Sequence, residues 1–172
     1  MLRLVKTSME QEAKVLDFLH EWRERSETIV PNTVDRDASD FGMYVKEIRD
    51  KESHENMELG KVPSTTYWLT DGDELLGAAN IRHELNEHLL NFGGHIGYGI
   101  KPSARGRGLA TKQLELALEK AKELGIERAL ITCDRTNVAS RQVILNNGGV
   151  PDTPFVEESG KVVERFWIEL KG

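Results

Sequence analysis

A glycine-rich turn between an expected strand and an expected helix constrains this chain more than any other feature. The run 95–100 stops at Pro102, and the turn Arg105-Gly-Arg-Gly108 leads into a long amphipathic segment that begins at Leu109. The first N–H groups of a helix have no partner within it, and the helix dipole is positive there, so such a turn is suited to bind an anion. The two arginines of the turn make a phosphate or pyrophosphate the expected ligand.

Two common phosphate-binding patterns do not fit this turn. A Walker A loop requires Gly-Lys followed by Ser or Thr, and the chain contains no such run. The dinucleotide fingerprint requires a third glycine where Thr111 stands. The pattern that fits is Arg-x-x-Gly-x-Ala, from Arg105 to Ala110, and it resembles the acetyl-CoA pyrophosphate loop of the GNAT superfamily of N-acetyltransferases.

The periodicity of the remaining chain predicts elements in the order that this superfamily has. We expect strands at 2–6, 65–70, 74–82, 95–100 and 129–133, and a last hairpin around Ser159-Gly160. We expect helices after a capping box at Thr7–Glu10, after Asp37 or Ser39, over 109–124, and after Asn137. A strand, helix and strand joined by short connections imply parallel strands. The sequence therefore predicts one α+β (α/β) domain over residues 1–172, with a mixed central sheet and flanking helices.

The resemblance also implies where a cofactor would lie. In the superfamily, the strand before the loop and the strand after the next helix splay apart, and the pantetheine arm of acetyl-CoA lies between them. Acetyl-CoA is therefore the expected cofactor, with coenzyme A as the product. The resemblance implies main-chain contacts to the cofactor from the strand, at Tyr98, Gly99, Ile100 and Lys101. The loop amides would bind the pyrophosphate, at Arg105, Gly106, Arg107, Gly108, Leu109, Ala110 and Thr111. An Asn-x-x-Ser motif that resembles the family's Asn-x-x-Ala would add Asn137 and Ser140.

The implied activity is transfer of an acetyl group to a primary amine of a small molecule or peptide by direct attack. This reaction needs an acceptor for the amine proton, and many relatives place a Glu where this chain has His95. Histidine titrates near neutral pH, so His95 is our first candidate for the base, with His83 and Glu84 next. Cys133 has apolar neighbours and no activating base near it in the sequence, so we expect a core residue rather than a nucleophile.

The departing thiolate also needs a proton, and here the chain departs from the family pattern. The position at which relatives often carry a tyrosine is Ile144, which has no proton to donate. Tyr98, Ser140 or water is left for that step, or the thiolate leaves unprotonated. The missing tyrosine also leaves a second function open, in which the protein binds an acyl-CoA as a sensor without turnover.

Composition limits the partners. A net charge of −6 argues against a broad electrostatic surface for nucleic acid or anionic membrane. A single cysteine and no long apolar run at the N-terminus lead us to expect a cytoplasmic protein without a disulfide, and we expect no bound metal. A homodimer is left open. Acidic residues in the first two expected helices and the segment between them suit a cationic amine as acceptor: Glu24, Glu27, Asp35 and Asp37.

Overall fold

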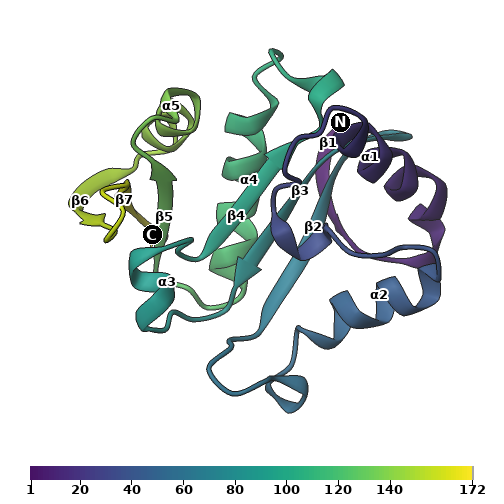
Figure 1. Cartoon of the computed structure of the whole chain (residues 1–172), viewed down its shortest axis with the longest axis horizontal. Helices are drawn as coiled ribbons and strands as arrows, with labels where there is room; N and C mark the ends of the chain where they lie inside the picture. The colour runs from purple at the N-terminus through teal and green to yellow at the C-terminus, as the bar shows by residue number, and fades with distance from the viewer. Residues whose placement is uncertain (172) are drawn as a thin grey trace.

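The chain contains both strands and helices, interspersed from one end to the other (Figure 1). The computed structural model describes residues 1–171. Its strands are β1 Leu2–Lys6, β2 Ser64–Asp71, β3 Glu74–Arg82, β4 Ile96–Ile100, β5 Arg128–Asp134, β6 Val150–Val156 and β7 Val162–Glu169. Its α-helices are α1 Glu12–Glu24, α2 Phe41–Asp50, α3 Glu87–Asn91, α4 Leu109–Glu123 and α5 Val138–Asn146, with short 3-10 helices at Met9–Gln11, Asn32–Val34, His54–Asn56 and Pro102–Ala104.

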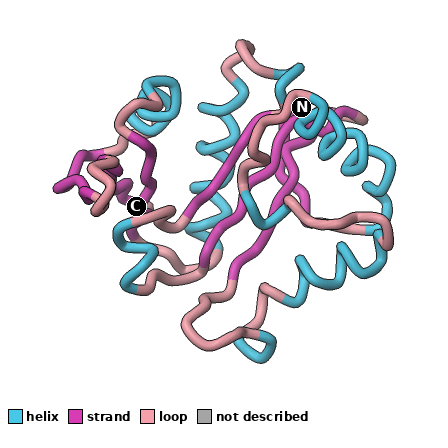
Figure 2. The backbone as a smooth tube through the Cα atoms, viewed as in Figure 1, coloured by secondary structure: helices cyan, strands magenta, loops and turns pink. Residues whose placement is uncertain are grey.

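The strands form two sheets, in which all neighbours pair antiparallel (Figure 2). The first has the order β1-β2-β3-β4, and the second has the order β5-β7-β6. The predicted combination of α and β elements is confirmed, but the single mixed sheet is replaced by two antiparallel ones. β4 and β5 are edge strands of different sheets because no ladder of backbone hydrogen bonds joins them.

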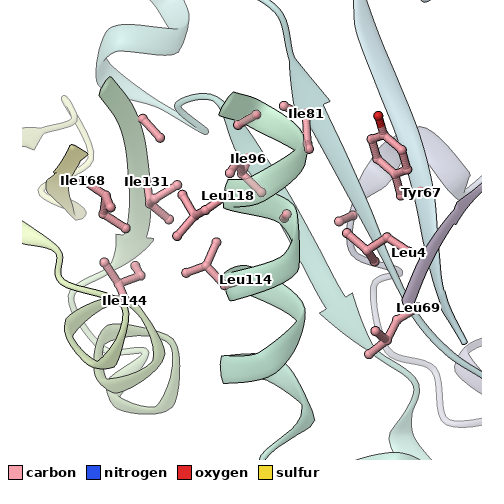
Figure 3. Close-up of a cluster of buried hydrophobic side chains, with 14 of the residues drawn as sticks. Leu4, Tyr67, Leu69, Ile81, Ile96, Leu114, Leu118, Ile131, Ile144 and Ile168 are labelled. Atoms are coloured by element: carbon pink, nitrogen blue, oxygen red, sulfur yellow. The ribbon is translucent and has the colours of Figure 1, made fainter. Parts of the chain in front are cut away.

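Helices cover both faces of the four-stranded sheet. On one face, α1 and α2 enclose a core in which Phe18 meets Trp68 edge to face, with 5.2 Å between ring centroids. On the other face, α4 places Leu114 and Leu118 between the two sheets (Figure 3). Burial of each such leucine contributes roughly 1.5–3 kcal/mol, so the apolar stripe of α4 is a main connection between the sheets.

The two sheets also meet through their backbones just before β4 begins. The His95 N–H donates to the Leu130 carbonyl over 2.8 Å, and the Gly93 N–H donates to Thr132 Oγ1 over 2.9 Å. Gly94 has a φ of +56°, and a Cβ placed there would lie 2.2 Å from the Leu130 carbonyl oxygen. Only glycine therefore permits these two backbone segments to approach so closely.

Three local predictions change in the structure. The capping box lies at Ser8 and Gln11 rather than at Thr7 and Glu10, because the Thr7 hydroxyl is buried and accepts a hydrogen bond from the Trp68 indole. Helix α2 begins after Asp40, whose carboxylate accepts the Met43 N–H. The short helix α3 was not predicted. No helix within residues 1–171 has the length and apolar character to cross a membrane.

Candidate active site

The glycine turn leads into α4 as the sequence predicts. Gly106 and Gly108 have φ values of +79° and +72°, in the left-handed region that favours glycine, and Gly108 is the N-cap of α4. No side chain caps the helix, and a Cβ at either glycine would meet no other residue within 4 Å. The first amides of α4 therefore lack a capping side chain, and space is open beside the turn.

The two arginines of the turn have different surroundings. The Arg105 guanidinium lies 2.8 Å from Glu27 and stacks over the Trp22 ring at 5.0 Å. Arg107 is half exposed, and its nearest carboxylate is that of Glu74, at 4.0 Å. Arg107 is therefore more available to an anion, whereas Arg105 fastens the turn to α1 and the segment after it.

Helix α1 also holds the start of the turn. The Glu21 carboxylate accepts the Ser103 N–H over 2.8 Å and the Ser103 hydroxyl over 2.7 Å. Burial raises the pKa of Glu21, but these hydrogen bonds and the charges of Lys101 and Arg25 together outweigh it, so the pKa lies below its ordinary value. Glu21 is therefore ionised at neutral pH, and it orients the turn without entering it.

Strand β4 offers backbone groups along its outer edge. The Arg82 N–H donates to the His95 carbonyl, and the Lys101 N–H donates to the Leu76 carbonyl. Backbone groups of an antiparallel strand alternate in direction, so the His95 carbonyl, the backbone groups of Gly97 and Gly99, and the Lys101 N–H face β3, whereas the His95 N–H is turned toward β5. The outward groups belong to Ile96, Tyr98 and Ile100. We predicted that Tyr98, Gly99, Ile100 and Lys101 contact the cofactor through their main chain. Such contacts require groups that point away from β3, and the groups of Tyr98 and Ile100 do so.

A cavity of about 370 Å³ lies beside this edge. It has walls from β4, β5, α5 and the segment after α1, and its lining includes Tyr98, Cys133, Asn137 and Ser140. We call it the β4–β5 cavity. The structure thus brings together predicted residues that are about 40 positions apart in the sequence.

The polar side chains of the β4–β5 cavity contact one another. The Tyr98 hydroxyl lies 3.2 Å from the Ser140 hydroxyl, and Asn137 caps α5 by accepting the Ser140 N–H. Burial raises the pKa of Tyr98 to about 12, so its hydroxyl keeps its proton at neutral pH. Burial also raises the pKa of the Cys133 thiol, which disfavours a thiolate nucleophile there.

His95 lies at the junction of the two sheets and is only 6% exposed. Its Nδ1 accepts the Leu130 N–H over 2.9 Å. A neutral imidazole has a single acceptor nitrogen, so this bond occupies the lone pair that a base would use. Burial, assisted by the positive charge of Arg82, lowers the pKa of His95 from 6.5 to about 4. The arrangement favours a structural role over the base role, which stays a prediction.

The other two base candidates, His83 and Glu84, do not line the β4–β5 cavity. His83 Nε2 is 2.8 Å from Thr65 Oγ1, and burial lowers the pKa of this histidine. The Glu84 carboxylate lies 3.5 Å from His54 Nε2. Ile144, at the position of the family tyrosine, is fully buried in the core. None of these three side chains lines the cavity that contains Tyr98.

A second cavity, of about 580 Å³, adjoins the first. The two share Asn32 and Arg82 in their linings, so Arg82 stands where they meet. The second cavity lies among β2, β3, α3 and the segments before β2, and we call it the lysine-lined cavity because Lys51 and Lys61 border it. The Arg82 guanidinium donates to the carbonyls of Gly93 and Gly94, both over 3.1 Å.

The acidic residues that we associated with the acceptor lie outside both cavities. Glu27 pairs with Arg105, Asp35 pairs with Arg23, and the Asp37 carboxylate accepts the Ser39 N–H. None of these, nor Glu24, lines either cavity. The sequence did not single out Arg82, and the one signal for it was a charged residue at the end of the largely apolar run 75–81.

Comparison with known proteins agrees with this geometry. The family model described as "Acetyltransferase (GNAT) domain" matches residues 3–150. The chain therefore belongs to the GNAT acetyltransferase family, and it is an acetyltransferase of that type. A search of curated protein sequences finds no match to this chain.

Solved structures share the fold at low sequence identity. An acetyltransferase from Salmonella typhimurium that modifies the N-terminal serine of ribosomal protein L7/L12 has 16% identity and a TM-score of 0.67, with 98% of this chain and 94% of that chain covered. The L7/L12 acetyltransferase RimL in complex with coenzyme A has 15% identity and a TM-score of 0.72, with coverage of 98% and 93%. Spermidine N-acetyltransferase from Vibrio cholerae, with CoA and spermine, has 17% identity and a TM-score of 0.65, with coverage of 98% and 95%.

Proposed function

We propose that this protein transfers the acetyl group of acetyl-CoA to a primary amine, and that the cofactor occupies the β4–β5 cavity. The observation that carries the proposal is the continuity of three features along β4: the outward backbone groups of Tyr98 and Ile100, the cavity beside them, and the uncapped turn that follows. Structural neighbours solved with acetyl-CoA or CoA bound support this choice of cofactor.

The pyrophosphate would bind at the start of α4. Open amides at Gly108 to Thr111, the positive end of the helix dipole and the guanidinium of Arg107 suit its charge. The pantetheine would run along the outer edge of β4, where amide and carbonyl groups alternate as in a strand. Asn137 and Ser140 would meet the end of the arm that carries the thioester, because both line the cavity.

In the reaction, the neutral amine attacks the thioester carbonyl carbon, and collapse of the tetrahedral intermediate breaks the carbon–sulfur bond. Tyr98 is our candidate donor to the departing thiolate, because its hydroxyl lies in the cavity and is protonated at neutral pH. The lone pair of His95 is engaged by Leu130, so we propose that the amine loses its proton to water rather than to one essential base.

The proposal predicts that thiol release from acetyl-CoA depends on an added amine. Free thiol and acetylated amine should form in equal amounts, measured by a thiol reagent and by mass spectrometry. The Cys133→Ser variant should behave in the same way, because direct attack needs no acyl-enzyme. Thiol release without an amine would indicate a thioesterase, and binding without turnover across a broad amine panel would indicate the sensor.

The cysteine also bears on location. Cys133 is the only cysteine of the chain and is buried as a free thiol. Disulfides are rare in the reducing cytosol, so a single unpaired thiol is consistent with it. We propose a cytoplasmic location on this ground.

A further inference from the structure

The lysine-lined cavity carries a charge opposite to that of the whole protein. Its lining includes the cations Arg36, Lys51, Lys61 and Arg82 against one carboxylate, that of Glu58. Arg36 is offset by Glu47 at 2.9 Å, but no ion pair of Lys51, Lys61 or Arg82 occurs within the described residues. Positive charge gathered in a hollow of a protein with a net charge of −6 attracts anions to that place.

Of the four cations of the lysine-lined cavity, Arg82 is the one that also lines the β4–β5 cavity. Its Nη1 donates to two backbone carbonyls, and these neutral partners leave its positive charge without a counterion. Its Nη2 faces β4, since it lies 3.9 Å from the position of a Cβ on Gly97. Desolvation lowers the pKa of Arg82, as expected for a charge enclosed without a carboxylate. A guanidinium in this setting is suited to bind carboxylate or phosphate oxygens.

We infer that the acceptor is a small amine that carries an anionic group, a carboxylate or a phosphate, and that this group binds in the lysine-lined cavity against Arg82, Lys51 and Lys61. The inference rests on the proposed function. The anion would lie in the lysine-lined cavity while the amine reaches past Asn32 and Arg82 to the thioester, because those two residues border both cavities.

This assignment reverses the acceptor charge suggested by composition. The acidic residues that favoured a cationic amine are paired with other side chains or lie outside the cavities, so they do not attract a polyamine to the site. Neighbouring cations also disfavour the ammonium form of a bound amine and therefore lower its pKa. The same charges that hold the anion would thus favour the neutral amine that attacks.

The test compares acceptors that differ in one anionic group. With acetyl-CoA saturating, kcat/KM is measured for β-alanine against β-alaninamide, for 2-aminoethyl phosphate against ethanolamine, and for spermidine. We expect the anionic member of at least one pair to be preferred by ~10-fold or more, with the preferred pair distinguishing carboxylate from phosphate. Equal rates within both pairs, or spermidine as the best acceptor, would overturn the inference and leave acetyl transfer intact.

Charge-removing variants test whether the preference for anionic acceptors comes from the cations of the lysine-lined cavity. Lys51→Gln/Lys61→Gln should reduce the preference at least ~5-fold, whereas Lys122→Gln, an exposed lysine outside both cavities, should not change it. Arg82→Gln should lose the preference and Arg82→Lys should retain part of it. An unchanged preference in the double lysine variant would refute the placement of the anion.

Binding provides a readout that does not require turnover. Inorganic phosphate and acetate are titrated into the CoA-saturated protein, because CoA then blocks the phosphate site at α4. Amide shifts in the nuclear magnetic resonance spectrum should map to the linings of the lysine-lined cavity and weaken in Lys51→Gln/Lys61→Gln. If no amine is acetylated but these shifts appear, the proposed function fails and the anion site stands; if no shifts appear, the anion site fails.

Discussion

Gly108→Glu is expected to lower the affinity for acetyl-CoA at least ~100-fold from a micromolar value. The new side chain would occupy the open space at the first turn of α4 and place a negative charge where the pyrophosphate must bind. A Cβ at Gly108 meets no other residue within 4 Å, so the cost to folding is limited to the strain of a non-glycine residue at a φ of +72°. The loss should therefore appear in binding far more than in folding. Isothermal titration calorimetry measures it directly.

Gly125→Glu is the matched control. Gly125 has a φ of +91°, also meets no other residue within 4 Å, and lies just beyond the opposite end of α4. The two variants share the backbone strain, about 1 kcal/mol, and the added charge, but only one lies at the proposed pyrophosphate site. Undiminished affinity in Gly108→Glu, or an equal loss in both variants, would sink the cofactor assignment.

His95→Ala is expected to lower the free energy of unfolding by ~2–4 kcal/mol, because it leaves the buried Leu130 N–H without its acceptor and opens a cavity. His95→Gln offers an amide oxygen in place of Nδ1 and should lose only ~1 kcal/mol. Denaturant unfolding at neutral pH measures both. If His95 is structural, folded His95→Gln should keep turnover within ~10-fold of the native protein, whereas loss of a general base would cost ~10²–10⁴-fold.

The low pKa of His95 predicts that the free energy of unfolding depends on pH. The pKa of His95 is about 4 in the folded protein against 6.5 for an exposed histidine, so the unfolded chain takes up the proton first as the pH falls. This difference in pKa contributes ~3 kcal/mol to the free energy of unfolding. The contribution is complete above pH 6.5 and is lost as the pH falls toward 4. His95→Gln should show a flatter decline over this range. Parallel curves for the two proteins would contradict the low pKa.

Local signals accounted for most of the elements. Asp71-Gly72 predicts the β2–β3 turn, Gly125 ends α4, and Asn137 caps α5, because each depends on a few adjacent residues. The capping box was placed one residue early because the Thr7 hydroxyl bonds to Trp68, a partner 61 positions away. The short helix α3, capped by Asn86, is too brief for periodicity to reveal.

Pairing between distant strands limited the prediction of the site. Periodicity identifies β4 and β5 but does not show that they belong to separate sheets, nor that these sheets meet where Gly94 approaches the Leu130 carbonyl. The role of Arg82 was missed for the same reason, because the two cavities exist only after β3, β4 and the segment around Asn32 assemble. The cofactor motif could be read from sequence because its glycines and helix start are contiguous.

The central claim, that acetyl-CoA occupies the β4–β5 cavity, is tested most directly by the reactivity of Cys133. This thiol lines the cavity and is the only one in the chain, so an alkylating reagent reports on that position alone. Its raised pKa calls for a mildly alkaline buffer. Saturating acetyl-CoA, whose sulfur is acylated and does not consume the reagent, should slow alkylation of Cys133 at least ~10-fold in the native protein, and the same concentration should give little protection in Gly108→Glu. An alkylation rate in the native protein that acetyl-CoA at saturation leaves unchanged would contradict the account.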